Sequence, residues 1–274
     1  MSRYESTREA WQAVGEPQPQ AVDFHRRQVM ARLLPATAVP NGRLCILGAG
    51  PCNDLDLAAL QARWSQVDLV DIDSSRVQQG VTSQVADARG IQVLTQDLLW
   101  GDHPLTPDPA SKQNIGRTVR ERISAATWSA VGQDYDLIAS TCLLSQLIEQ
   151  VIEIIGSDAP EFVATIQTLR RRHFELMARA LRSGGTGWLF CDFVSSETLP
   201  ELLSTVPQAL PQLLEQALTE GNFFHGLNPG ILLQVLRQDE HLTLLVDQSQ
   251  ITNPWVWLTG ERAYAVVGIR FIRV

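Results

Sequence analysis

Short apolar runs alternate with segments of helical spacing along most of the chain. One helix is expected over Asn53–Arg63, another starts near Ser74 with its hydroxyl as the cap, and a third ends at Ser183-Gly184-Gly185. Alternation of strands and helices predicts an α/β fold, doubly wound around a mostly parallel sheet. The runs that predict strands are Leu44–Leu47 and residues 67–73, 91–97, 135–141 and 187–193.

The two ends of the chain depart from this alternation. Residues 1–40 predict a helical cap that ends near Pro35, followed by a Rossmann-like domain over residues 41–274. At the C-terminus, two β runs joined by residues 259–262 predict an antiparallel hairpin at the sheet edge. Inserted segments are expected to cover an acceptor pocket, although a role as contacts of a homodimer stays open. These insertions lie at about residues 101–133, 143–180 and 195–240.

Composition and charge narrow the choice of partners. The chain has 274 residues, 45% of them hydrophobic, which is enough for a sizeable core. The formal net charge of −8, with scattered basic residues, argues against nucleic acid and anionic membranes as partners. No apolar run is long enough to span a membrane, and the polar, charged start does not resemble a signal peptide. The four cysteines lack metal-type spacing, so we expect reduced thiols in a cytoplasmic protein.

The stretch RLCILGAGPCNDLDL, residues 43–57, carries the clearest chemical signal. Gly48 and Gly50 let the chain turn sharply at the end of a buried strand and bring its backbone close to a ligand. Asp71 lies at the end of the next predicted strand, 21 residues after Gly50. A carboxylate there can accept both hydroxyl groups of an adenosine ribose. The combination predicts a binding site for an adenosine-containing ligand.

The residues after the glycine turn indicate which adenosine-containing ligand the site binds. A dinucleotide site would have a third glycine where this chain has Asn53. We expect Asp54 and Asp56 in the first helical turn, where acids suit a site that holds no phosphate. A ligand with an ammonium and a sulfonium fits better, and S-adenosylmethionine is such a ligand. A nicotinamide-dependent oxidoreductase and a non-catalytic Rossmann-like binding protein remain the alternatives.

In motif order, residues 43–274 resemble the class I, seven-stranded S-adenosylmethionine-dependent methyltransferases. The matching motifs are CILGAGPCNDLDL, LVDID, LTQDLL, YDLIASTCLLSQL and ALRSGGTGWLFCDF, with Cys52 where the family often has a third glycine. The resemblance implies a seven-stranded sheet with a reversed last strand, the ribose on Asp71, adenine against Ile72 and its amino group near Asp97. The cofactor-binding residues that it implies are Gly48, Ala49, Gly50, Asp71, Ile72, Asp97, Leu98, Ser140 and Thr141, the last two beside the methionine portion.

The resemblance also implies methyl transfer, and we expect a small-molecule acceptor with an oxygen or nitrogen nucleophile. Such transfer depends mainly on alignment and desolvation, since the cofactor supplies the electrophile. A histidine base would help an oxygen acceptor, and His225 in an inserted loop is the candidate. We expect His173, which follows three arginines, on a solvated face, and His241 at a strand edge.

No metal site is expected. Among the acids, Asp192 alone is well placed at the end of a predicted strand, and one carboxylate is too few for a catalytic metal. Trp255 and Trp257 alternate along the hairpin and therefore share one face. We expect that face to pack against the core or a helix rather than to line the acceptor pocket.

Overall fold

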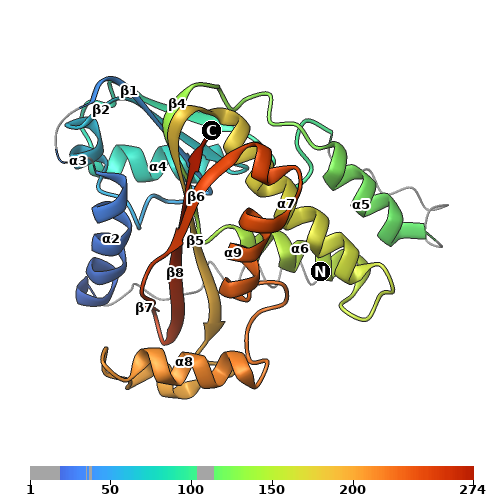
Figure 1. Cartoon of the computed structure of the whole chain (residues 1–274). Helices are drawn as coiled ribbons and strands as arrows, with labels where there is room; N and C mark the ends of the chain where they lie inside the picture. Colours follow the sequence, from blue (N-terminus) through green and yellow to red (C-terminus); the bar gives the residue numbers. More distant parts are fainter. Residues whose placement is uncertain (1–18, 35, 37–38, 104–113) are drawn as a thin grey trace.

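The computed structural model describes residues 19–34, 36, 39–103 and 114–274, and Figure 1 shows helices on both sides of a central sheet. The described strands form one eight-stranded sheet in the order β3-β2-β1-β4-β5-β8-β6, with β7 also paired to β8. Strands β1 to β5 pair in parallel and every pair with β8 is antiparallel. The doubly wound, mostly parallel sheet with a C-terminal hairpin is thus confirmed. The strands are β1 (Val39–Leu47), β2 (Trp64–Asp71), β3 (Ile91–Thr95), β4 (Tyr135–Thr141), β5 (Leu181–Ser195), β6 (Val246–Ile251), β7 (Trp255–Thr259) and β8 (Arg262–Arg273).

The sheet has eight strands rather than seven because its edge is interrupted. Strands β6 and β7 follow each other along β8 and pair with its two halves. Between them, Thr252 N donates to Gly268 O at 2.9 Å, and Gly268 N donates to the Thr252 side chain at 2.9 Å. Pro254 has no N–H to continue the ladder. Together β6 and β7 occupy the place of one broken edge strand, the sixth along the chain, and β8 is the reversed last strand.

Eight α-helices and two short 3₁₀-helices of the described chain connect these strands. Figure 1 shows α8 beyond the carboxyl end of β5, and α2 packs against β7. Of the expected cap, residues 1–18 lie outside the described residues, as do residues 104–113 of the first insertion. The α-helices are α2 (Pro19–Leu33), α3 (Leu57–Gln61), α4 (Ser74–Gln84), α5 (Ile115–Ala125), α6 (Leu144–Ile155), α7 (Phe162–Ala180), α8 (Leu210–Thr219) and α9 (Pro229–Gln238), and the 3₁₀-helices are η2 (Pro200–Leu203) and η3 (Leu242–Leu244).

Side-chain capping moves one of the expected helix starts and changes the capping residue of another. The helix expected over Asn53–Arg63 begins only at Leu57, because the Asp56 carboxylate caps α3 by accepting from Ala59 N at 2.9 Å. The acids expected in its first turn therefore precede the helix. Helix α4 starts at Ser74 as predicted, but its cap is Asp73, whose carboxylate accepts from the backbone of the first turn.

Two expectations about later segments are wrong. Helix α7 ends at Ala180, and Ser183-Gly184-Gly185 lies inside β5, where the pairing with β4 shifts register. Gly184 takes φ 74° there, so the glycine serves an irregular strand instead of a helix end. His241 precedes the 3₁₀-helix η3 rather than a strand, because the Asp239 side chain caps the turn through Leu242 N.

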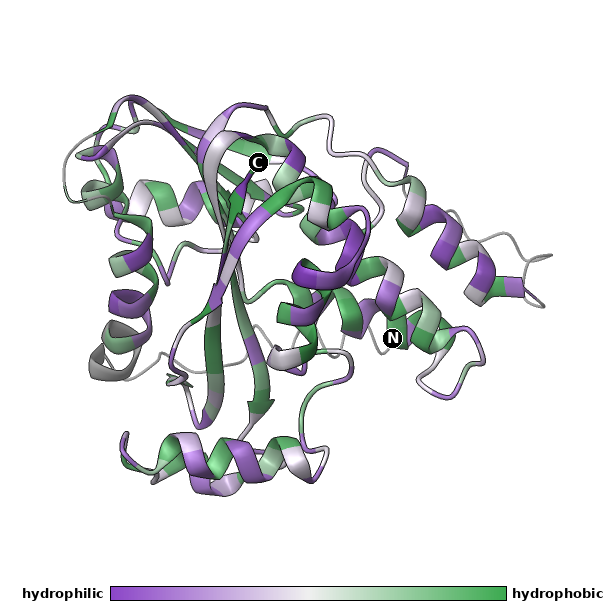
Figure 2. Cartoon of the chain, viewed as in Figure 1, coloured by the Kyte–Doolittle hydropathy of each residue, from purple (hydrophilic) through white to green (hydrophobic). Residues whose placement is uncertain are grey.

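The two faces of the sheet carry separate hydrophobic cores. Alternation along β1 and β4 sends Ile46 and Ala139 to one side, which α2, α3 and α4 cover. Leu47 and Ile138 point to the other side, under α5, α6 and α7. Figure 2 shows the central strands as largely hydrophobic and α5 as rich in hydrophilic residues. A side chain's position in a strand thus decides which helices it meets.

Candidate functional site

The glycine turn lies at the carboxyl end of β1, where the strand order reverses between β1 and β4. Gly48 and Gly50 have φ of 73° and 49°, which disfavour residues with a Cβ. The N–H groups of Gly48 and Ala49 both donate to Val70 O, at 2.9 and 3.2 Å, and fix the turn to the end of β2. A Cβ on Gly50 would meet nothing within 4 Å, so there is open space beside its backbone. Ligands of open α/β sheets bind at such a reversal point.

Cys52 adopts a backbone conformation that glycine favours. Its φ is 59°, in the left-handed region, and its side chain is buried next to the turn. The thiol lies 3.8 Å from Gly50 O. Gly80 of α4 approaches the same loop, because a Cβ there would lie 2.3 Å from Pro51 O. The loop after the turn therefore takes a glycine-like conformation at Cys52 and packs closely against α4.

Replacing Gly80 with Ala is expected to destabilise the fold by about 2 kcal/mol, because α4 would have to move away from Pro51. Ala favours a helix interior by about 1 kcal/mol over Gly, so the measured loss understates the clash. Denaturant unfolding measures the change, with Thr82→Ala on the exposed side of α4 as the control. A Gly80→Ala variant as stable as the wild type would contradict this close approach.

Asp71 joins the end of β2 to the glycine turn. Its Oδ2 accepts from Gly50 N at 2.9 Å, and its Oδ1 accepts from Asp73 N at 3.0 Å. The carboxylate is half-buried, and each oxygen keeps lone-pair capacity for a further donor. Ile72 beside it is 59% exposed, although it is a large apolar residue. The pair can therefore offer two acceptors to a vicinal diol and an apolar surface to a flat ring.

The two polar residues at the end of β4 face opposite sides of the sheet. Thr141 Oγ1 donates to Gly48 O at 3.0 Å, so this residue does meet the turn. Ser140 is fully buried on the other side, with its Oγ 3.0 Å from His173 Nε2. The structure brings Thr141 together with Gly48, Gly50 and Asp71 but leaves Ser140 in the core.

His173 is buried, so its expected place on a solvated face is wrong. Only 2% of its surface is exposed, and its ring meets the edge of Trp128. Burial lowers the pKa of His173 to about 4, which keeps the imidazole neutral at physiological pH. The three preceding arginines suggested an exposed position, but His173 lies on the side of α7 that faces the sheet.

Asp97 and Leu98 support the loop after β3. Asp97 Oδ1 accepts from Leu99 N at 2.9 Å and from Trp100 N at 2.8 Å, which shapes a turn. Leu98 is buried in the core on the α5–α7 side. The resemblance implied that Asp97 contacts adenine, and in the structure its Oδ1 is used by the backbone of this loop.

Asp192 is a buried carboxyl group on the same face of the sheet as the glycine turn. Its Oδ1 accepts from Ser145 Oγ at 2.8 Å. Burial raises the pKa of Asp192 to about 6; the Ser145 hydrogen bond opposes this shift and the nearby Asp54 adds to it. A carboxyl group with such a pKa can exchange a proton near neutral pH.

The N-terminal helix contributes a residue that the sequence analysis did not select. His25 of α2 is fully buried, its Nδ1 accepts from Trp255 Nε1 at 3.1 Å, and its ring stacks on Trp257 with 4.6 Å between centroids. The two tryptophans therefore pack against a helix, as expected. His25 Nε2 lies 3.6 Å from Asp54 Oδ1 in the loop after the glycine turn. A histidine in a polar, weakly periodic segment gave no local signal of this position.

His225, the expected base, lies on the surface. Its side chain is exposed, and its ring contacts the edge of Phe162 at the start of α7, with 5.5 Å between centroids. None of its described contacts reaches Gly48, Gly50 or Asp71.

All four cysteines are free and buried. Burial raises the pKa of Cys52 to about 12 and those of Cys45, Cys142 and Cys191 well above the ordinary value. Since the thiolate is the reactive form, these side chains are not nucleophiles near neutral pH.

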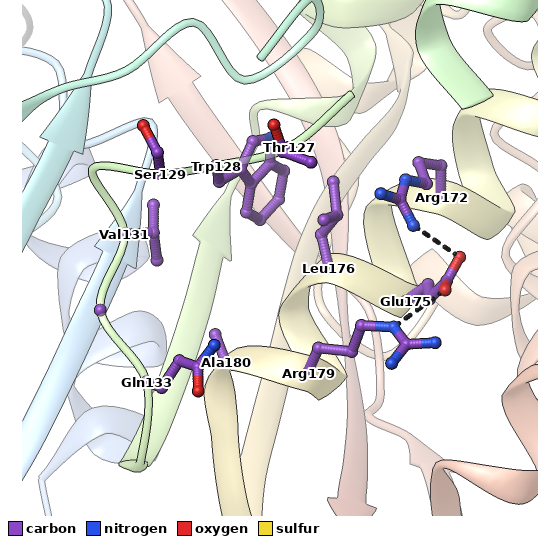
Figure 3. A pocket seen from close by; sticks show the side chains of 11 residues that line it. Thr127, Trp128, Ser129, Val131, Gln133, Arg172, Glu175, Leu176, Arg179 and Ala180 are labelled. Atoms are coloured by element: carbon purple, nitrogen blue, oxygen red, sulfur yellow. Dashed lines mark hydrogen bonds and ion pairs between the residues drawn. The ribbon is translucent and has the colours of Figure 1, made fainter. Parts of the chain in front are cut away.

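A cavity of about 400 Å³ lies apart from the glycine turn, between α7 and the segment that leads into β4 (Figure 3). Its three charged side chains pair with one another, because Arg172 and Arg179 each donate to Glu175 at 2.9 Å. Neither Gly50 nor Asp71 lines it. This cavity therefore belongs to a different part of the molecule.

The described residues lack two further kinds of feature. They contain no group of three His, Cys, Asp or Glu side chains arranged to hold a metal ion. None of their helices combines the length and hydrophobicity needed to cross a bilayer.

No family model and no curated protein matches the chain. Among solved structures, it is similar to the N-methyltransferase NodS from Bradyrhizobium japonicum, with 12% identity, 92% of this chain and 96% of that chain covered, and a TM-score of 0.46. It is also similar to a TehB-like SAM-dependent methyltransferase from Corynebacterium glutamicum, with 13% identity, 99% and 97% covered, and a TM-score of 0.42. Similarity at this level carries no conclusion about what this chain binds.

Proposed function

We propose that the chain is an S-adenosylmethionine-dependent methyltransferase that acts on a small-molecule acceptor at oxygen or nitrogen. The observation that carries the proposal is the bond from Gly50 N to the Asp71 carboxylate, at the reversal point of the sheet. This hydrogen bond holds the Asp71 carboxylate, which can accept two hydrogen bonds, beside the open space next to the Gly50 backbone. Such an arrangement suits the two hydroxyl groups of an adenosine ribose. The exposed Ile72 next to Asp71 suits an adenine ring.

The charge of the site favours a cation over phosphates. Asp54 follows the turn, and Asp192 lies on the same face, near enough that Asp54 raises its pKa. Two acids in this position would repel the pyrophosphate of a dinucleotide. They complement a sulfonium and an ammonium, which supports S-adenosylmethionine over a nicotinamide cofactor.

When bound, the cofactor would supply the electrophilic methyl group, and the protein would align the acceptor and exclude water. Asp71 would hold the sugar and Thr141 would brace the turn through Gly48 O. For an acceptor that must lose a proton, Asp192 suits the role of base better than His225, because it is buried on the same face as the turn. A base with a pKa near neutrality accepts protons efficiently at physiological pH.

Calorimetric titration of the wild-type protein tests this function. S-adenosylhomocysteine, the demethylated product, is expected to bind with a dissociation constant in roughly the micromolar range, and NAD is expected to show no binding at similar concentrations. Saturation by NAD but not by S-adenosylhomocysteine would overturn the proposal in favour of an oxidoreductase. Failure of both ligands to bind would favour a non-catalytic Rossmann-like protein.

A further inference from the structure

A chain of three side chains connects the C-terminal hairpin, the N-terminal helix and the loop after the glycine turn. Trp255 Nε1 donates to His25 Nδ1 at 3.1 Å, and His25 Nε2 lies 3.6 Å from Asp54 Oδ1. Trp255 belongs to β7, His25 to α2 and Asp54 to the loop that leads to α3. Segments that are far apart in sequence therefore converge on one carboxylate next to the candidate site.

The hydrogen bond from Trp255 determines the tautomer of His25. Burial lowers the pKa of His25 more than Asp54 raises it, so the ring is neutral. Since Nδ1 accepts the indole N–H, the single ring proton is on Nε2. This Nε2–H is buried and has no hydrogen-bond partner within the described structure. His25 Nε2 lies 3.6 Å from Asp54 Oδ1, a distance slightly too long for a hydrogen bond.

Asp54 keeps a free side toward solvent. Its side chain is 23% exposed, and among the described ion pairs it is matched with His25 and with no arginine. Arg26 contacts the neighbouring residue of the loop instead, because its Nε donates to Asn53 O at 2.8 Å. The neutral His25 supports one edge of the carboxylate without cancelling its charge. The other edge is available to a cationic group.

We propose that Asp54 binds the ammonium group at the amino-acid end of the cofactor, and that His25, locked by Trp255, is the positioning residue that orients the Asp54 carboxylate. This inference rests on the proposed function. The cofactor is the source of the ammonium because Asp54 lies only four residues after Gly50, in the loop that also holds Cys52 against the turn. The N-terminal helix thereby becomes part of the cofactor site as well as a cover.

Two product-like ligands separate this role from adenosine binding. S-adenosylhomocysteine carries the ammonium, whereas 5′-methylthioadenosine shares the adenosine and thioether but lacks the amino-acid group. The Asp54→Asn variant is expected to bind S-adenosylhomocysteine about 10- to 100-fold more weakly, the usual effect of losing one charge-assisted hydrogen bond. Its affinity for 5′-methylthioadenosine is expected to stay within about twofold of wild type, because no contact to that ligand is lost.

The matched control is Asp56→Asn, which removes the same charge two residues away. Asp56 caps α3, and Asn is an equally good cap, so both affinities are expected to remain at the wild-type level. If Asp54→Asn weakens both ligands equally, or neither, the assignment of the ammonium to Asp54 is wrong. A wild-type protein that binds neither ligand would instead overturn the proposed function.

Variants of His25 test the positioning role. His25→Ala is expected to weaken S-adenosylhomocysteine about 5-fold and to leave 5′-methylthioadenosine unchanged. His25→Gln keeps an acceptor and a donor on one carbon, as the imidazole does, and is expected to restore most of the affinity. Equal losses for both ligands, or no recovery in His25→Gln when its melting temperature matches the wild type, would overturn this role for His25.

Discussion

Replacing Asp71 with Ala is expected to weaken the binding of S-adenosylhomocysteine by about 100-fold or more. The variant loses the acceptor for both ribose hydroxyls and also the carboxylate that receives Gly50 N, so the turn itself loses its anchor. Unlike Asp54→Asn, it is expected to weaken 5′-methylthioadenosine as strongly, since both ligands carry the ribose. Calorimetric titration of wild type and variant with the two ligands measures the effect.

Two further variants make the Asp71 result specific. Asp71→Asn keeps one carbonyl acceptor and is expected to show an intermediate loss. Asp87→Asn removes an exposed acid between α4 and β3 and is expected to bind like wild type. An Asp71→Ala variant that binds S-adenosylhomocysteine with wild-type affinity would contradict the proposal that an adenosyl group binds at the ends of β1 and β2.

Replacing Asp192 with Asn is expected to stabilise the fold by about 3 kcal/mol near pH 8. Burial raises the pKa of Asp192 from 3.8 to about 6, so the folded state binds a proton more tightly than the unfolded state. Wild-type stability therefore falls as the pH rises from about 4 to about 6 and stays reduced above that window. The Asn side chain has no charge to bury, so the advantage of the variant disappears near pH 4.

Denaturant unfolding of both proteins between about pH 4 and pH 8 measures this difference. Ser145→Ala removes the donor to the Asp192 carboxylate and is expected to destabilise the protein near pH 8 but much less near pH 4. A stability difference between Asp192→Asn and wild type that does not change with pH would contradict the raised pKa. Higher stability of Asp192→Asn than of wild type would fit the trade-off between stability and activity that is expected when a buried charged group serves function.

Much of the fold and part of the candidate site could be predicted from sequence, because they depend on local patterns. The alternation of strands and helices specified the doubly wound sheet, since periods of 2 and 3.6 residues are visible within short windows. Gly48, Gly50 and Asp71 were identified together, and the structure joins Gly50 to Asp71 through a hydrogen bond. These residues could be identified because a sharp turn with positive φ favours glycine, and because a carboxylate at the end of the next strand is an unusual signal.

Other parts of the site depend on which side of an element a residue faces. Ser140 and Thr141 are adjacent in sequence, yet only Thr141 meets the turn, because successive side chains of a strand point to opposite faces. His173 reads as solvated next to three arginines, but α7 turns it to the sheet. The sequence could not reveal these orientations without the packing of α7 on β4.

By itself, the sequence determined the order of the elements, the glycine turn and the acid that closes it. Only the tertiary structure decided which distant groups complete the site. Trp255 and His25 lie 230 residues apart, and Asp54 reaches His25 only because α2 packs against β7. Local periodicity shows which face of a helix or strand is buried, but not which other element packs against that face. Contacts between residues so far apart in sequence form only when the sheet and its helices pack together.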